Sequence, residues 1–439
     1  MSTISISSTM TRQLLAILTR NCSTSAKPLA KPSKYVPKKA KYVNEINDYL
    51  QSSPFRKSAD SIPSTFKNCN SCPPETLICI DSTTADTIAD RIASSASYIT
   101  SSIDRTPVLE MSPGPGLVSS ELLKRGVNNL RLYEPNPVLN SNLQDLAKKN
   151  KQRVNVFPHD LNSLAKLIYV DQVSKSDNMG TIMHGIKRLE PPEITSVVVG
   201  ACPNPIFVHL LPYMTANNQG FPQYGLTEYF LIVHPYNYLR MNAEPGKHYY
   251  RYRYHSVATQ IFYNIELLEK LDRKSFLPWE KPYQPKQRDK QIKLFTHDEE
   301  YLYLLRLTPK KPSYELSPLE KQQLWYFLRY NLFARKAEVF TLFKKWIPEC
   351  VSRLEQFGID EKTCIGELSP DMLLRLFLAF IKWPEFPYCS FNSSMEMSFL
   401  KSNFNFIESA SEKEQLVPVG SVIHGRSERM NSLSEELVT

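Results

Sequence analysis

The sequence predicts an α/β protein with a doubly wound, mostly parallel sheet, followed by a small all-helical domain. Between residues 77 and 312, short apolar runs alternate with segments of helical spacing, which is typical of parallel strands joined by crossover helices. Each apolar run ends at an acid or at a turn rich in Gly and Pro. From residue 313 to 390 the apolar spacing is helical throughout. We therefore expect a sheet domain at 77–312 and a helical domain at 313–390.

The stretch from Pro107 to Gly116 organises the expected sheet domain. It contains a short apolar run, an acid and a turn dense in Gly and Pro, and helical spacing begins at Leu117. This order predicts a strand, a tight loop and a helix. Gly114 and Gly116 let a ligand approach the backbone closely, and the helix that follows directs its amide donors toward the loop. The loop suits a small cofactor with an anionic or carboxylate end.

Several polar segments follow expected strands and should meet in one crevice. Further strands are expected at 129–133, 153–157, 197–199, 229–233 and 301–307. In a doubly wound sheet, ligands bind beyond the carboxyl ends of the strands. The loop Ser112–Gly116, Glu134, Asp160 and the segment Gly200–Pro203 all lie at such ends.

The acids of this crevice favour an adenosyl cofactor. Glu134 is placed to accept hydrogen bonds from ribose hydroxyls, and Asp160 from an adenine amine. The loop is not a Gly-x-Gly-x-x-Gly fingerprint, which disfavours a dehydrogenase. Acids at Glu110, Glu134 and Asp160 suit a cofactor with a positively charged methionine end. This is the arrangement for S-adenosylmethionine.

Composition limits the class of protein and its partners. The 439 residues include 53 Lys and Arg against 44 Asp and Glu, and the net charge of +9 favours a polyanionic partner. Nucleic acid and an anionic membrane surface both fit. No run of about 18 uncharged apolar residues occurs, so no membrane span is expected. The eight cysteines are scattered, which favours reduced thiols, and the pair Cys69 and Cys72 lacks the further ligands of a zinc site.

The two ends of the chain differ in composition from the middle. Residues 1–45 are basic and Ser-rich, with an apolar face between Arg12 and Arg20 and no acid before Glu45. This composition predicts a mitochondrial presequence, and hence the mitochondrial matrix, with a disordered basic tail as the alternative. Residues 46–76 are expected to be a linker and residues 391–439 a disordered tail. Residues 161–192 read as a polar surface insertion.

Two basic segments are candidates for nucleic-acid contact. The run Tyr249–His255 interleaves aromatic and cationic side chains, a mixture that can stack on bases and neutralise phosphates. The alternative is an edge strand or loop with one apolar face. Lys281–Lys293 is a second basic patch. The residues expected to contact nucleic acid are Arg251, Tyr252, Arg253, Lys286, Arg288 and Lys290.

Residues from about 77 to 385 resemble the ribosomal RNA adenine dimethyltransferase family and, within it, the mitochondrial transcription factor B branch. The motifs that carry the resemblance occur in the family's order: Glu110-Met-Ser-Pro-Gly-Pro-Gly116, Glu134, His159-Asp160, Val199-Gly-Ala-Cys-Pro203, Pro245-Gly246, Phe276-Leu-Pro278, Asn331-Leu-Phe-Ala-Arg-Lys336 and Glu367-Leu-Ser-Pro370. The resemblance implies an S-adenosylmethionine-dependent methyltransferase fold. The cofactor-binding residues that it implies are Cys79, Gly114, Gly116, Glu134 and Asp160.

The chain departs from the family at the site for the target base. Active members have Asn-Leu-Pro-Tyr after the fourth strand, where the Asn side chain and Pro carbonyl hold the amine of a flipped adenine and the ring stacks on it. Here the positions hold Ala201, Cys202, Pro203 and Asn204. The amide and the ring are both missing, so no catalytic residue is expected. Ser112 replaces the first Gly of the family's loop, and its Cβ crowds the approach of the cofactor.

These losses are similar to those of the second mitochondrial paralogue, which acts as a transcription initiation factor rather than chiefly as a methylase. The resemblance then implies a protein that joins the mitochondrial RNA polymerase at promoter DNA and stabilises the melted strands. Two alternatives stay open. One is a working mitochondrial ribosomal RNA adenine dimethyltransferase, and the other is a component of the mitochondrial ribosome that uses the fold only to bind RNA.

Overall fold

The computed structural model describes residues 38–52, 62–67, 76–100, 106–203, 205–247, 251–279, 298 and 300–398. The chain divides into two compact units, residues 1–47 and 48–439, and the second holds the sheet and the helical region. Residues 1–37 of the expected presequence, together with Cys69 and Cys72, lie outside the described residues. Within the expected linker, residues 64–67 form the short helix α3 (Ser64–Lys67). A longer helix, α2 (Lys38–Ser52), spans the boundary between the units.

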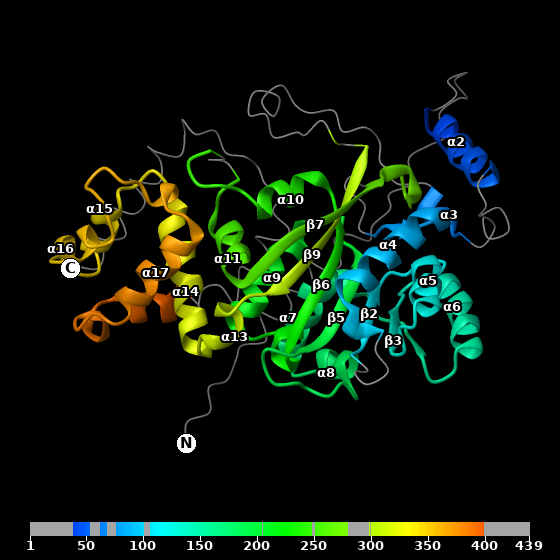
Figure 1. The fold of residues 1–439 in the computed structure, drawn as a ribbon, viewed down its shortest axis with the longest axis horizontal. Coiled ribbons are helices and arrows are strands. Elements are labelled where there is room, and N and C mark those ends of the chain that lie inside the picture. Colours follow the sequence, from blue (N-terminus) through cyan, green and yellow to red (C-terminus); the bar gives the residue numbers. More distant parts are fainter. Residues whose placement is uncertain are drawn as a thin grey trace, which may run out of the picture. The chain divides into compact units, whose positions relative to one another are not determined.

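A seven-stranded sheet lies at the centre of the second unit, in the order β4-β3-β2-β5-β6-β9-β7 (Figure 1). Its strands are β2 (Val108–Met111), β3 (Leu130–Tyr133), β4 (Val154–Phe157), β5 (Ile194–Ala201), β6 (Leu226–Val233), β7 (Tyr263–Asp272) and β9 (Tyr301–Pro309). Neighbouring strands from β4 to β6 are parallel, whereas β9 is antiparallel to β6 and to β7. The doubly wound, mostly parallel sheet is confirmed. A separate antiparallel pair joins β1 (Ile78–Cys79) to β8 (Phe276–Leu277).

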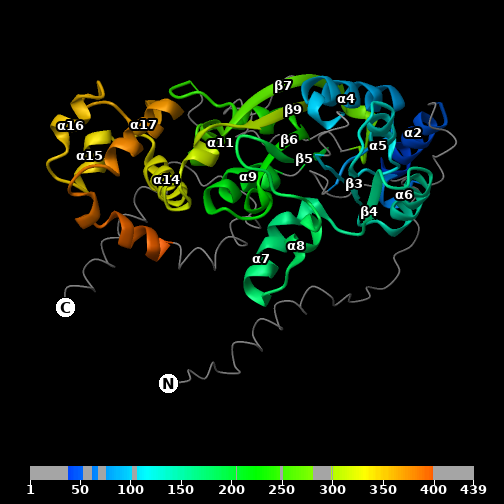
Figure 2. The same cartoon turned by 60° about the horizontal axis from the view of Figure 1, so that its bottom comes forward.

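Helices cover both faces of the sheet because its central strands are apolar on both sides. In β5, Val197 and Val199 belong to one hydrophobic core and Val198 to the other. The first core contains residues of α4 (Ser82–Ser95), α5 (Leu117–Lys124) and α6 (Pro137–Lys149). The second contains residues of α7 (Leu164–Ser174), α8 (Asn178–Met183), α9 (Pro205–Asn217), α10 (Pro235–Met241) and α11 (Tyr254–Phe262). Figure 2 shows α7, α8 and α9 on the side of the sheet opposite α4.

The segment 161–192 is exposed in its middle, as its composition suggested, but its two helices are packed in the hydrophobic core. Its helices α7 and α8 carry a set of side chains buried in the second core: Leu164, Ile168, Met179, Ile182 and Met183. The polar residues between them are local hydrogen-bond acceptors. Asp171 accepts from the backbone N–H groups of Asn178 and Met179, and Asp177 caps α8 by accepting from the N–H of Gly180. The polar middle, residues 172–177, is exposed as expected, and some of its polar side chains also cap helix ends.

The helical region consists of α13 (Pro312–Glu315), α14 (Pro318–Asn331), α15 (Val339–Lys344), α16 (Val351–Glu355) and α17 (Pro370–Phe380). A capping box between Ser317 and Glu320 starts α14, and Ser369 caps α17. The aromatic side chains that the helical spacing aligned are buried: Trp325, Phe327, Phe340, Phe343 and Trp346. They belong to the same core as α9 and α11. The chain is still helical at 391–398, with Phe391 and Met395 buried, so the ordered region extends beyond the expected boundary at residue 390.

Candidate cofactor and target-base site

The carboxyl ends of four parallel strands bring the expected crevice together. Met111, the last residue of β2, pairs with Tyr133 of β3 on one side and with Gly200 of β5 on the other. The residues that follow, Ser112, Glu134 and Ala201, therefore leave the sheet at the same edge. The gap between β2 and β5 is also where the strand order reverses, the usual ligand position of a doubly wound sheet.

The two loop glycines are required by packing as well as by backbone geometry. Gly114 and Gly116 have φ values of 59° and 80°, a region that residues with a Cβ rarely adopt. A Cβ on Gly114 would lie 2.7 Å from the Cβ of Ile78, and one on Gly116 would lie 2.8 Å from Cδ2 of Leu143. The loop therefore packs directly against β1 and α6, and these contacts alone require glycine at both positions.

Glu134 holds this loop in place. Its Oε2 accepts a hydrogen bond from the N–H of Gly114 at 3.1 Å, and its Oε1 accepts one from the N–H of Asn136 at 2.9 Å. The side chain is almost fully buried. Burial raises the pKa of Glu134 to about 7, against the lowering effect of the two backbone donors, and the charge of Asp160 raises it further. The expected ribose acceptor is thus also a structural link between β3 and the loop.

Glu110 is a second buried acid in the crevice. Its Oε2 accepts a hydrogen bond of 2.6 Å from the hydroxyl of Ser119 in α5. Burial raises its pKa to about 7, the Ser119 hydroxyl lowers it, and the charge of Glu134 raises it. Two carboxyls that ionise near neutral pH favour a cationic ligand, because a positive charge would offset the cost of ionising them in a buried site.

A hydrogen-bonded strap joins the loop after β4 to the loop after β2. Asp160 accepts from the N–H of Asn162 at 2.9 Å and caps the short helix η3 (Leu161–Ser163). The Nδ2 of Asn162 donates to the hydroxyl oxygen of Ser112 at 3.0 Å. Ser112 has a φ of 47°, which an L residue adopts only at a cost of about 1–2 kcal/mol. The serine in place of the family's glycine is therefore both strained and held by this bond.

Cys79 is placed near the crevice but offers it no reactive group. It lies in β1 next to Ile78, which contacts the loop at Gly114, and its thiol donates to the backbone carbonyl of Asp81 at 3.5 Å. Burial raises the pKa of the Cys79 thiol to about 12. The residue packs as a small apolar side chain, and its contact with a cofactor stays a prediction.

The target-base side of the crevice presents small, buried side chains. Ala201 ends β5 with 5% of its surface exposed, and Cys202 is 1% exposed. The N–H of Cys202 donates to the carbonyl of Ile232 at 2.8 Å, so the strand pairing with β6 continues through this point. Burial raises the pKa of the Cys202 thiol. Asn204 lies outside the described residues.

The strand order, the glycine loop after β2, the acid Glu110 within β2 and the acids after β3 and β4 define an S-adenosylmethionine-dependent methyltransferase fold. A model of the ribosomal RNA adenine dimethylase family matches residues 78–382. The chain belongs to this family.

The chain is also similar to individual proteins. The chain is 27% identical over 350 residues to the Drosophila melanogaster protein called dimethyladenosine transferase 2, mitochondrial, covering 70% of this chain and 76% of that one. A dimethyladenosine transferase from Plasmodium falciparum is similar at 16% identity with a TM-score of 0.45, covering 67% of this chain and 95% of that structure. The 23S rRNA methyltransferase ErmE gives 19% identity and a TM-score of 0.43, covering 69% and 98%.

The residues present fit S-adenosylmethionine, the cofactor of this family, on one side of the crevice. Glu134 and Asp160 present carboxylate oxygens at the ends of successive strands, where ribose hydroxyls and an adenine amine would be held. Buried acids at Glu110 and Glu134 suit the positively charged methionine end. When bound, the cofactor supplies a methyl group for transfer.

The structure describes three of the residues expected to contact nucleic acid, Arg251, Tyr252 and Arg253. Tyr252 is 1% exposed, and its hydroxyl donates to the carbonyl of Leu368 at 2.6 Å. The interpretation of Tyr252 as a base-stacking residue is therefore wrong, because its ring is enclosed between α11 and the helical region. Arg251 and Arg253 on either side are half-buried, and their contact with nucleic acid stays a prediction. Lys286, Arg288 and Lys290 lie outside the described residues.

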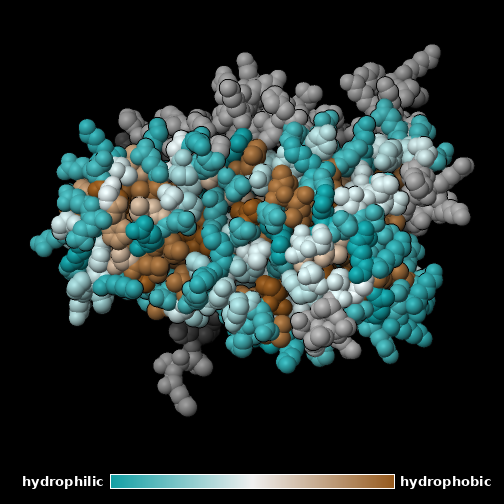
Figure 3. Space-filling view, viewed as in Figure 1, coloured by the Kyte–Doolittle hydropathy of each residue, from teal (hydrophilic) through white to brown (hydrophobic). Residues whose placement is uncertain are grey.

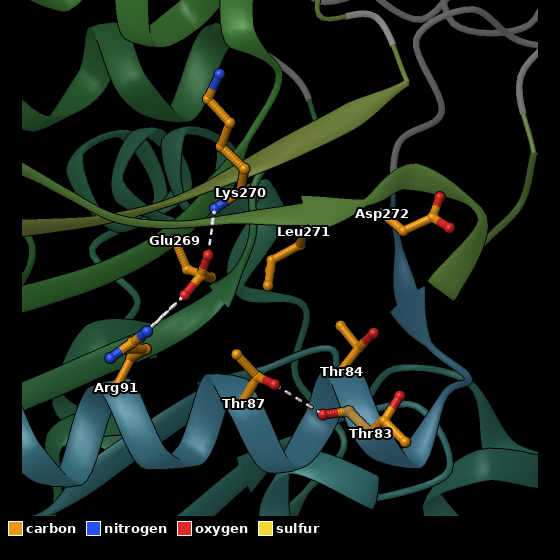
Figure 4. A pocket seen from close by; sticks show the side chains of 8 residues that line it. All are labelled: Thr83, Thr84, Thr87, Arg91, Glu269, Lys270, Leu271 and Asp272. Atoms are coloured by element: carbon orange, nitrogen blue, oxygen red, sulfur yellow. Dashed lines mark hydrogen bonds and ion pairs between the residues drawn. The ribbon is translucent and has the colours of Figure 1, made fainter.

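A shallow groove of about 430 Å³ lies between α4 and β7, away from the residues expected from the sequence (Figure 4). Its polar groups already bond to one another. Thr87 donates to the carbonyl of Thr83 at 3.0 Å, and the Arg91 guanidinium pairs with Glu269 at 2.8 Å. Figure 4 shows the threonines and Arg91 along α4, facing the strand residues. The groove is a seam between the two elements rather than a ligand site.

Sequence reasoning missed a buried histidine pair between α9 and α11. The rings of His209 and His255 lie 4.3 Å apart, and neither Nε2 has a hydrogen-bond partner in the described part of the chain. Burial lowers the pKa of His209 to about 3 and that of His255 well below its usual value, with Arg240 and Arg253 acting in the same direction. Both imidazoles are therefore neutral at physiological pH. No local pattern could have paired residues so far apart in the chain.

The described ranges contain no cluster of three or more His, Cys, Asp or Glu side chains suited to a metal ion. Among the helices described, none has the length and apolarity needed to cross a membrane.

Proposed function

We propose that this protein is a mitochondrial transcription initiation factor that assists the mitochondrial RNA polymerase in promoter melting. In this proposal the dimethyltransferase scaffold keeps its shape and its nucleic-acid surface, whereas base methylation is weak or lost. The protein would contact promoter DNA as part of a complex with the polymerase in the matrix.

The observation that carries the proposal is the side chain of Ala201 at the end of β5. A methyl group with 5% exposure stands where active members of the family hold the exocyclic amine of adenine with a carboxamide. Losing one oriented hydrogen-bonding group of this kind typically lowers a rate by roughly a hundredfold to a thousandfold. Cys202 beside it is buried and cannot supply the missing acceptor.

The location and the paralogue type have separate support. Residues 1–45 have the basic, acid-poor composition of a presequence. The Drosophila relative is named as the second mitochondrial dimethyladenosine transferase, in agreement with the resemblance to the second paralogue. The net charge of +9 favours association with a polyanion.

Run-off transcription on a linear promoter tests the proposal. Purified mitochondrial RNA polymerase would be assayed with and without this protein, on a closed duplex and on the same template with a pre-melted start site. We expect stimulation on the closed duplex and much less on the pre-melted template. Equal transcription with and without the protein on the closed duplex would contradict the proposal.

A working ribosomal RNA adenine dimethyltransferase is the second candidate, favoured by the preserved cofactor side of the crevice. The loop at Gly114 and Gly116 keeps its backbone geometry, and Glu134 keeps its bond to Gly114. Methylation of a small-subunit ribosomal RNA hairpin by the wild type would be compared with the double variant Ala201→Asn, Asn204→Tyr. Methylation at a full rate by the wild type would favour this candidate. Absence of S-adenosylmethionine binding in calorimetry would remove it.

A further inference from the structure

Phe333 is an exposed phenyl ring of the helical region with three cations close to it in the sequence. Phe333 lies in the short helix η6 (Leu332–Ala334) with 78% of its surface exposed, although its neighbour Leu332 is 2% exposed. The segment 329–336 contains Arg329, Arg335 and Lys336 and no acid. Single exposed hydrophobic residues are common and need no explanation. The combination with three cations distinguishes this ring.

The backbone that presents Phe333 is anchored on both sides. The Nδ2 of Asn331 donates to the carbonyl of Phe327 at 2.9 Å, which fixes the end of α14. The N–H of Gly366 donates to the carbonyl of Arg335 at 3.0 Å, which ties the segment to the chain before α17. The ring is therefore carried by an ordered turn, so little backbone entropy is lost when it is covered.

A second exposed aromatic residue lies close to Phe333 in the sequence. Tyr330 is 39% exposed, and its ring lies 4.9 Å from that of Trp346. Figure 3 shows hydrophobic residues gathered on the surface over the helical region. The acid nearest in sequence after this segment, Glu338, accepts a hydrogen bond from the hydroxyl of Thr341 at 3.1 Å.

One cation of the segment 329–336 reaches the chain that precedes α11. The Nη1 of Arg335 donates to the carbonyl of Tyr252 at 3.4 Å. Arg251 and Arg253 flank that carbonyl in the chain, so arginines of both regions meet at this contact. A surface that combines an aromatic ring with several cations matches single-stranded nucleic acid, whose bases stack and whose phosphates are anionic.

We propose that Phe333 is a stacking platform for an unpaired base of a single-stranded polynucleotide, with Arg329 and Lys336 beside it for the adjacent phosphates. The inference rests on the nucleic-acid binding of the proposed function but on neither methylation nor promoter melting. It also replaces Tyr252, the buried ring that the sequence suggested, with a ring on the surface. Because every base has an aromatic face, the platform accepts DNA and RNA without a strong sequence preference.

Fluorescence anisotropy with labelled dT12 and U12 tests the proposal on the purified full-length protein. Phe333→Ala should weaken binding of both oligonucleotides about 5-fold to 100-fold, the typical range for one stacked base. Phe333→Leu, which keeps apolar bulk without the ring, should be nearly as weak. Phe333→Trp should bind as the wild type, and its added fluorescence should be quenched by dT12.

The chain provides a matched control. Tyr388 in η8 (Phe386–Tyr388) is 90% exposed in the same region, but it lies beside Glu385, which is paired with Arg353. Tyr388→Ala should leave the affinity unchanged. Equal losses in Phe333→Ala and Tyr388→Ala, or no loss in either, would overturn the proposal.

Salt dependence and oligomeric state exclude two other roles for the ring. Phe333→Ala should keep the salt slope of the wild type, whereas Arg329→Ala should reduce it by about one unit of log affinity per log salt. A wild-type dimer that dissociates in Phe333→Ala, measured by light scattering, would show that a second copy of the chain covers the ring and would overturn the proposal. None of these readouts depends on the polymerase, so failure of the transcription assay would leave them interpretable.

Discussion

The Oε2 of Glu134 lies 3.1 Å from the backbone nitrogen of Gly114 and accepts its hydrogen bond across the crevice. This bond joins the loop after β2 to the residue after β3, and the charge of Glu134 raises the pKa of Glu110. Both carboxyls have pKa values raised to about 7. The crevice should therefore change its charge near neutral pH.

The free energy of unfolding should depend on pH because Glu110 is buried. The pKa of Glu110 in the folded protein, about 7, lies above the ordinary value of 4.5. The contribution of Glu110 to the free energy of unfolding is therefore complete below pH 4.5 and is lost as the pH rises to about 7. Glu110→Gln stays neutral, and its amide oxygen can still accept from Ser119. We expect the variant to gain unfolding free energy relative to the wild type between pH 5 and pH 8, by about 3 kcal/mol at most. Urea unfolding at both pH values measures this difference, and an identical pH dependence in the two proteins would contradict it.

Binding of S-adenosylmethionine should release protons. A cationic ligand favours the ionised form of nearby acids, so binding lowers the pKa values of Glu110 and Glu134. We expect affinity to increase from pH 6 to pH 8. Calorimetry at pH 7 in phosphate and in Tris should give different heats, because the two buffers take up protons with different enthalpies. Equal heats in the two buffers would show that neither acid changes its ionisation.

Ser112→Gly should strengthen cofactor binding. Glycine adopts the φ of 47° without strain and removes the Cβ that is expected to crowd the cofactor, at the loss of the bond from Asn162. We expect about a tenfold gain in affinity for S-adenosylmethionine, equivalent to about 1.4 kcal/mol, measured by calorimetry. Gln152→Gly is the matched control, since Gln152 has a φ of 75° on the exposed surface after α6. A similar gain in the control would show that the effect is not local to the crevice.

Glu228 in the sheet should make a large contribution to the free energy of unfolding. Its buried carboxylate accepts from Arg306 at 2.6 Å, from Thr308 at 3.0 Å and from the hydroxyl of Tyr98. Glu228→Ala leaves these groups without their acceptor and should cost about 3 kcal/mol or more of unfolding free energy.

The exposed pair of Arg91 and Glu269 is the control for this change. Its side chains are 47% and 31% exposed, so Arg91→Ala should cost less than about 1 kcal/mol in the same urea titration. Comparable losses in the two variants would show that burial does not set the strength of the Glu228 network.

Arg251 and Arg253 should contribute to nucleic-acid affinity through phosphate contacts. Replacing both by Ala should reduce the slope of log affinity against log salt by about one unit for each lost contact. Anisotropy titrations with a single-stranded oligonucleotide at several salt concentrations give the slope. Lys124→Ala on α5, an exposed lysine paired with Glu121, should leave it unchanged. An unchanged slope in the arginine variant would place these side chains away from the bound strand.

The parts of the fold that the sequence predicted are those governed by local pattern. The apolar run of β5 identifies a buried strand, because a parallel strand must be apolar on both faces. The acid Glu110 within β2 and the acids that follow β3 and β4 identify the crevice. The edge strand β7 carries no such run. It has Glu266, Glu269 and Lys270 among its residues and an irregular register between Leu267 and Glu269. Edge strands tolerate such charges, and the alternation of the pattern is lost at the irregularity.

The candidate nucleic-acid residues were less predictable, because alternation of Tyr and Arg fits an exposed segment as well as a buried one. Tyr252 is buried by a partner 116 residues away in the chain, Leu368, and no local pattern contains that contact. Phe333 lay within a motif of the small helical domain, but its exposure depends on how η6 is anchored. Site residues at the ends of strands could therefore be predicted from the sequence. Site residues whose exposure depends on packing between the two regions could not.

The contact at Tyr252 works in both directions: its hydroxyl donates to Leu368, and its carbonyl accepts from Arg335. Tyr252 thus joins the sheet domain to the helical region by two hydrogen bonds, one that it donates and one that it accepts. These two hydrogen bonds restrict hinge motion between the two regions. The distance between Arg251 and Phe333 is therefore fixed before a nucleic-acid strand binds to both. The distance between these two residues should then set a minimum length for an oligonucleotide that contacts both. Oligonucleotides shorter than this length should lose one of the two contacts abruptly.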